Sequence, residues 1–169
     1  MVLEFLAEHP ELGGGKVKVL PTEGNVSALN IPHASMVFDL HDTTELTAEL
    51  LNGGGLATEV VRYANIVSFT CLKAFAFDHR NARKDAHDLV YCLEHYPGGL
   101  DSVISAFKDA LAGSHAEAVQ EALAKLKTRF VHDDPDQSYR RDGAVAVARF
   151  EDNDADVDDN EEIRDLRIL

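Results

Sequence analysis

The sequence has no tryptophan, only two cysteines and little positive charge. Its 16 lysine and arginine residues stand against 30 aspartate and glutamate residues, which gives a formal net charge of −14. Such a chain is repelled by nucleic-acid duplexes and anionic bilayers, so its bulk charge argues against duplex DNA or a membrane as partner. It also lacks an apolar run of membrane-spanning length and the N-terminal pattern of a signal peptide. These absences predict a cytoplasmic protein.

The two cysteines, Cys71 and Cys92, both fall in segments with helical periodicity, beside apolar residues. Small thiols are common in protein cores, whereas disulfides are rare in reducing compartments. We therefore expect two reduced thiols rather than a disulfide, which suits the cytoplasm.

The chain is long enough and apolar enough to bury a core. It has 169 residues, of which 45% are hydrophobic, which fits one compact domain with a mobile tail. Residues 1–64 show strand patterns, residues 65–131 show helical periodicity, and residues 132–169 are polar and acidic. Strands followed by helices predict an α+β fold, a small mixed, mostly antiparallel sheet followed by a helical bundle.

The expected strands are short and separated by turn residues. Apolar or alternating runs predict strands at residues 2–6, 16–20, 26–31, 36–40 and 58–63. The glycine triplets at residues 13–15 and 53–55 mark turns. Asp42, Thr43 and Thr44 are expected to cap a short helix or to form a turn.

Helical periodicity begins near Ile66. Phe69, Leu72 and Ala76 mark one apolar face of the first helix, and the sequence DHRN at residues 78–81 is expected to bend or break it. Two later helices have apolar positions at Leu100, Val103, Ile104, Phe107 and Leu111, and at Val119, Ala122, Leu123, Leu126 and Phe130. A capping box is expected between Ser114 and Glu117, at the start of the second of these helices.

Charged residues recur at helical spacing in one apolar stretch, residues 72–94. A continuous helix would place Lys73, Arg80, Lys84 and Asp88 on one stripe, separate from an apolar face. One interpretation is a pair of surface helices laced by i,i+4 ion pairs such as Lys84–Asp88, each worth a few tenths of a kcal/mol.

The same residues support a second interpretation. The order K-A-x-A from Lys73, then Arg80, then K-D-x-x-D-L with Lys84, Asp85 and Asp88, resembles the C-terminal helical signature of nucleotidyltransferase-fold proteins of the abortive-infection toxin type, the AbiEii-like family. The signature covers about a seventh of the chain, with a looser likeness over residues 2–111. The resemblance implies a nucleotidyltransferase-like fold and a place in a toxin–antitoxin or phage-defence pair.

The resemblance also implies roles for single residues. Lys73, Arg80 and Lys84 would bind the phosphates of a nucleotide or of an RNA end, since their compact or planar cations suit phosphate oxygens. Lys73, Asp85 and Asp88 would be the catalytic group, with the aspartates orienting the cations or contacting the nucleotide. The resemblance further favours a short helix at residues 144–150, whose sequence alternates like a strand yet is rich in alanine.

The metal site of the family is the point at which the chain departs from the pattern. In the family a Gly-Ser or Gly-Gly loop and a D-x-D pair hold Mg²⁺, and no such motif precedes Glu4. The resemblance implies that Glu4 stands in place of the Asp that is the last metal-binding carboxylate of the family, and the alternative is an exposed glutamate on an edge strand. Asp39 has the same two interpretations. The chain is then either a truncated or split form, with Mg²⁺ bound by a half encoded elsewhere, or a protein that binds without catalysing.

An alternative function is a non-enzymatic acidic interaction module. A chain of charge −14 can dock a basic partner through its helices or its acidic tail, as a cognate toxin or antitoxin would require. An exposed apolar patch on the sheet, where a missing N-terminal half would pack, would support this function. A second copy of the chain could close the same patch, so we expect a homo-oligomer.

Overall fold

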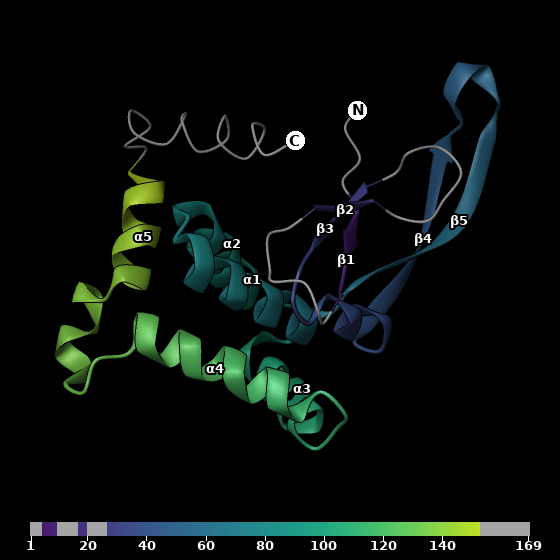
Figure 1. Ribbon diagram of the computed structural model, residues 1–169. Coiled ribbons are helices and arrows are strands. Elements are labelled where there is room, and N and C mark those ends of the chain that lie inside the picture. Colours follow the sequence, from purple (N-terminus) through teal and green to yellow (C-terminus); the bar gives the residue numbers. More distant parts are fainter. Residues whose placement is uncertain (1–4, 10–16, 20–26, 153–169) are drawn as a thin grey trace. The chain divides into compact units, whose positions relative to one another are not determined.

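The computed structural model describes residues 5–9, 17–19 and 27–152, which form a mixed α+β fold (Figure 1). The predicted α+β class is therefore confirmed. The chain divides into two compact units, Met1–Leu72 and Lys73–Leu169, and the boundary falls within the first α-helix. Within the described ranges, no helix combines the length and the apolar character needed to cross a bilayer.

Three short strands of the first unit form a mixed sheet of order β1-β3-β2. They are β1 (Leu6–Ala7), β2 (Val17–Val19) and β3 (Ser27–Asn30). β1 runs parallel to β3, and β2 runs antiparallel to it. The expected strands at residues 16–20 and 26–31 are confirmed in these positions, whereas Glu4, the candidate metal ligand, lies outside the described residues.

The other two strands pair with each other and form a second sheet rather than an extension of the first. β4 (His41–Glu49) and β5 (Leu56–Ala64) are antiparallel, with Glu49 opposite Leu56 at the turn. The turn contains η2 (Leu51–Gly53), and Gly55 adopts a φ of 86°, a backbone conformation that glycine tolerates best. The strand predicted at residues 58–63 is confirmed, but the cap or turn predicted at residues 42–44 is wrong, since these residues lie within β4.

The strand predicted at residues 36–40 is also wrong. Residues Ala34–Phe38 form a 3₁₀ helix, η1, in which Met36 N donates to His33 O at 3.1 Å. His33 begins the turn with a left-handed φ of 63°, and Met36 is buried. The apolar residues here are thus placed by a local turn. Asp39 ends it and is exposed.

The helix α1 (Ile66–Arg80) begins at Asn65, whose side-chain oxygen accepts hydrogen bonds from the backbone N–H groups of Val67 and Ser68 at 3.0 and 3.1 Å. It ends where Asn81 takes a φ of 54°, so the predicted break at residues 78–81 is confirmed.

The buried face of α1 differs from the predicted one. Val67, Cys71, Ala74 and Phe77 are buried at helical spacing, whereas the predicted positions Phe69, Leu72 and Ala76 are only partly buried. Both sets are apolar and helically spaced. Only packing distinguishes them.

In the described part of the second unit, four further α-helices follow. They are α2 (Arg83–Glu94), α3 (Gly99–Leu111), α4 (Ala116–Phe130) and α5 (Asp142–Glu151), with the 3₁₀ helix η3 (Pro135–Arg140) before α5. Their buried centre is formed by Phe77, Ala86 and Ala146, against which Phe130 and Val147 pack. The short helix expected at residues 144–150 is confirmed as α5.

The capping box predicted before α4 is wrong. His115 occupies the N-cap position, and no side chain there accepts a hydrogen bond from the first turn. Ser114 therefore lies one residue too early to cap this helix. Sequence spacing placed the helix correctly but missed its first residue.

Candidate functional site

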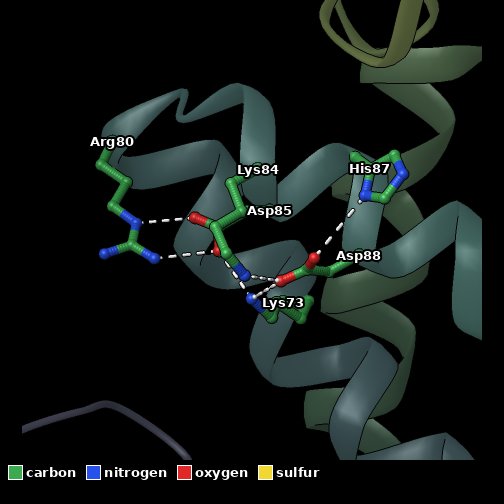
Figure 2. Close-up of polar contacts among 6 residues, drawn as sticks. All are labelled: Lys73, Arg80, Lys84, Asp85, His87 and Asp88. Atoms are coloured by element: carbon green, nitrogen blue, oxygen red, sulfur yellow. Dashed lines mark hydrogen bonds and ion pairs between the residues drawn. The ribbon is translucent and has the colours of Figure 1, made fainter. Parts of the chain in front are cut away.

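Five charged residues of the second unit converge where α1 faces α2. Lys73 and Arg80 project from α1, and Lys84, Asp85 and Asp88 project from the first two turns of α2 (Figure 2). The break at Asn81 folds the chain back, so the two helices are not the one continuous helix that a single stripe assumes. We call these five residues the charged cluster. It contains every residue that the sequence predicted for nucleotide binding or catalysis in this stretch.

Asp85 is the centre of the charged cluster. Its side chain is only 1% exposed, yet both of its oxygens have cationic partners. Arg80 donates to it from Nε at 2.6 Å and from Nη2 at 2.9 Å, a two-bond contact, and Lys73 Nζ donates at 2.9 Å. A carboxylate buried to this degree needs such partners, because desolvation of an unpaired charge costs several kcal/mol.

Asp88 forms the second half of the cluster, one turn further along α2. Its Oδ2 accepts hydrogen bonds from Lys73 Nζ at 2.8 Å and from Lys84 Nζ at 2.7 Å. The ion pair of Lys84 with Asp88 is the predicted i,i+4 contact and is confirmed. Lys73 therefore bridges two carboxylates of α2, and this bridge holds the two helices together.

The pKa values of the cluster favour its charged forms. Burial alone would raise the pKa of Asp85, but hydrogen bonds from Arg80 and Lys73 outweigh burial and lower it. The pKa of Asp88 is lowered in the same way by Lys73 and Lys84 against its own desolvation. Burial would lower the pKa of Lys73, and its two aspartate partners raise it instead. All three groups are thus ionised near neutral pH.

Exposure rises from the centre of the cluster to its edge. Lys73 is 22% exposed, Arg80 is 47% exposed and Lys84 is 70% exposed. Three cations face two carboxylates, so the cluster carries one positive charge in excess within a strongly acidic chain. Its two most exposed members, Arg80 and Lys84, are both cations.

The hydrogen bonds that Asp85 and Asp88 already accept limit their contact with a ligand. Asp85 is covered on both oxygens, so it acts on Lys73 and Arg80 rather than on a bound molecule. The carboxylates of Asp85 and Asp88 already face cations and do not fit a Mg²⁺ site. Across residues 5–9, 17–19 and 27–152, no three His, Cys, Asp or Glu side chains lie close enough to hold a metal ion.

A second ionic cluster joins the end of α1 to α4, and sequence spacing did not predict it. Asp78 accepts hydrogen bonds from Lys125 Nζ at 2.8 Å and from Arg129 Nε at 3.2 Å. Arg129 also forms an ion pair with Asp142 at the start of α5. Hydrogen bonds from Lys125 and Arg129 lower the pKa of Asp78. These partners lie about fifty residues from Asp78 in sequence, and no local pattern relates them.

The two thiols and the aromatic side chains of α2 are not members of the charged cluster. Both cysteines are free, as predicted, and burial raises the pKa of Cys71 to about 12. His87, Tyr91 and His95 stack in a column along α2, with ring centroids 5.9 and 4.2 Å apart. Tyr91 lies between the two imidazoles and is 52% exposed.

Comparison with known proteins gives no match to a family model, to a curated protein or to a solved structure.

Proposed function

We propose that the charged cluster binds the phosphates of a nucleotide or of an RNA end. The observation that carries this proposal is the outward exposure of Arg80 and Lys84, whose cations are held in place by carboxylates behind them. A phosphate needs positive donors at fixed positions, and Lys84 uses one of its three ammonium donors on Asp88.

The aspartates have a positioning role in this proposal. Asp85 fixes Arg80 through two hydrogen bonds, and Asp88 fixes Lys84 through one. Long cationic side chains lose conformational entropy when they bind, and holding them beforehand reduces that loss. Lys73 sits deeper and neutralises both carboxylates, so that the cluster stays positive towards solvent.

The proposal is limited to binding, because Glu4, the metal ligand that the resemblance implies, lies outside the described residues. The resemblance to AbiEii-like nucleotidyltransferases supports a place in a toxin–antitoxin or phage-defence pair. Mg²⁺ enters this proposal with the nucleotide, because it binds phosphate oxygens while keeping several waters.

A thermal-shift titration with ATP, CTP, GTP and UTP, each with and without Mg²⁺, tests the proposal. A ligand that binds only the folded chain raises the melting temperature by mass action. We expect a shift with at least one nucleotide and a smaller shift in Lys84→Gln at the same nucleotide concentration. Lys108→Gln removes an exposed lysine from α3 and is the matched control. Equal shifts in both variants would place binding elsewhere, and no shift in the parent protein would refute nucleotide binding.

A non-enzymatic interaction module is the second candidate function. It is supported by the β4–β5 hairpin, in which the register places the exposed side chains of Leu46, Val61 and Tyr63 on one face. Contiguous exposed apolar side chains are typical of protein interaction sites. This function predicts that hairpin substitutions change association with another chain, while nucleotides leave the melting temperature unchanged.

A further inference from the structure

The last described helix ends beside the charged cluster. α5 packs against α2, and the ring centroid of Phe150 lies 4.4 Å from that of His87. His87 is a direct neighbour of the cluster, since its Nδ1 lies 3.7 Å from Oδ1 of Asp88 (Figure 2). Asp152, the C-cap of α5, follows Phe150 within one helical turn. The chain therefore leaves α5 close to the first two turns of α2, from which Lys84 projects.

The sequence that follows α5 has the opposite charge to the exposed edge of the cluster. Residues 153–162, which we call the acidic segment, are mostly aspartate and glutamate and contain neither lysine nor arginine. They lie outside the described residues, so only their sequence and their attachment to α5 are used here. Arg80 and Lys84, at the edge of the cluster, are 47% and 70% exposed. Opposite charges that one chain keeps close together attract each other.

The acidic segment is long enough to reach these cations. An extended chain spans up to about 3.3 Å per residue, so the segment can extend over roughly 30 Å from its attachment at Asp152. Lys84 lies one turn before His87, about 5 Å along the axis of α2. Attachment to α5 also keeps the segment at an effective concentration on the order of millimolar. A contact too weak to form between separate molecules can therefore form within one chain.

We propose that the acidic segment binds the charged cluster at Arg80 and Lys84 and competes there with phosphate. This inference rests on the proposed function, because it adds regulation of the same site. Carboxylate and phosphate oxygens are both strong acceptors for ammonium and guanidinium donors, so the two groups suit the same cations. Exposed ion pairs are individually weak. The segment therefore lowers the affinity for phosphate without closing the site.

Neutralisation of the acidic segment in the full chain tests the competition. A matched control removes the same number of exposed carboxylates from α3, from the loop after α4 and from η3, so both variants have the same net charge. The segment variant carries Asp154→Asn, Asp156→Asn, Asp158→Asn and Asp159→Asn, and the control carries Asp101→Asn, Asp109→Asn, Asp133→Asn and Asp136→Asn. Circular dichroism checks that both variants fold.

Isothermal titration with inorganic pyrophosphate, which has the phosphate groups but no base, measures the affinity. We expect the segment variant to bind about fivefold more tightly than the parent protein, because the parent's site is open only part of the time. The control should bind as the parent does. Equal affinities of the parent and the segment variant, or equal strengthening in both variants, would overturn the inference and leave phosphate binding intact. No binding by any of the three proteins would overturn the proposed function, and this inference with it.

A zero-length cross-link tests the contact in the absence of any ligand. A carbodiimide joins a lysine amine to a carboxylate that touches it, as an amide formed with loss of water. We expect a product with the mass of one chain, 18.5 kDa, in which peptide mass spectrometry finds Lys84 joined to the acidic segment. Lys84→Gln should lose this product. Cross-links of the segment to other lysines as often as to Lys84, or only between two chains, would overturn the inference.

Discussion

The ammonium of Lys73 lies 2.9 Å from a carboxylate oxygen of Asp85, and this aspartate is almost completely buried. The contact joins α1 to α2, and Lys73 reaches Asp88 as well, at 2.8 Å. Substitution of Lys73 would therefore change helix packing and ligand binding together. Lys84, at the exposed edge of the charged cluster, separates the two effects.

Replacement of Asp85 by asparagine should destabilise the protein strongly. The substitution keeps the size of the side chain but leaves Lys73 and Arg80 without their shared negative charge. Removal of one partner from a buried ion pair costs about 3 kcal/mol or more. Urea unfolding measures the loss. Asp109→Asn, at an exposed position of α3, is the control and should change stability by less than about 0.5 kcal/mol. Similar losses in the two variants would show that Asp85 has no special structural role.

Stability should fall as the solution is acidified. The pKa values of Asp78, Asp85 and Asp88 are all lowered below their ordinary value of 3.8. A group with a lowered folded-state pKa contributes full stability above its unfolded pKa and loses it as pH falls through the folded pKa. The loss therefore begins near pH 4 and continues below it.

Unfolding free energies measured at a series of acidic pH values test this expectation. Asp85→Asn should show a shallower decline than the parent protein, because one of the three carboxylates no longer titrates. A parallel decline in the two proteins would contradict the lowered pKa of Asp85.

Gly143 should not tolerate a side chain. A Cβ atom at this position would lie 2.7 Å from the ring of Phe130, which packs against the core. Overpacking of this kind costs about 1–3 kcal/mol. Gly113→Ala is the matched control, since the nearest atom there is 3.4 Å away. Thermal unfolding should show a lower melting temperature for Gly143→Ala than for Gly113→Ala, and the reverse order would contradict the packing of Phe130.

The two thiols should react at different stages of unfolding. Cys71 is buried and its pKa is raised to about 12, so almost no thiolate exists at pH 8. Cys92 is partly exposed, although burial first and Asp88 second also raise its pKa. Ellman's reagent should label Cys92 slowly in the native protein and Cys71 only after urea unfolding. Cys92→Ser identifies the two phases, and rapid native labelling in this variant would contradict the burial of Cys71.

Helices were predicted well because their signals are local. The 3.6-residue periodicity and the residues Pro97 and Gly98 placed α2, and Asn81 ended α1 where the sequence DHRN indicated a break. The ion pair Lys84–Asp88 followed from spacing within one helix.

Strand β4 was missed because its sequence does not alternate as a half-buried strand does. Within its nine residues, Leu46 and Ala48 are the only apolar ones, and most positions face water. At Met36 a strand was predicted where none exists. The apolar run there folds as a 3₁₀ helix that begins at the left-handed His33. Both outcomes depend on contacts and backbone angles that spacing does not encode.

The sequence predicted which residues form the charged cluster but not how they are arranged. The sequence placed Lys73 and Asp88 on a stripe of one helix, whereas they face each other across two helices. The burial of Asp85 has no sequence signal, because a helical aspartate is usually exposed. The partners of Asp78 come from α4, too far along the chain for any periodic pattern.

Isothermal titration of nucleotide into the parent protein, Lys84→Gln and Lys108→Gln at low salt tests the central claim most directly. Phosphate binding at the charged cluster predicts binding to the parent and to Lys108→Gln. It predicts an affinity about tenfold lower for Lys84→Gln, with unchanged unfolding free energy because Lys84 is 70% exposed. Equal affinities of the three proteins, or no heat of binding in any of them, would contradict it.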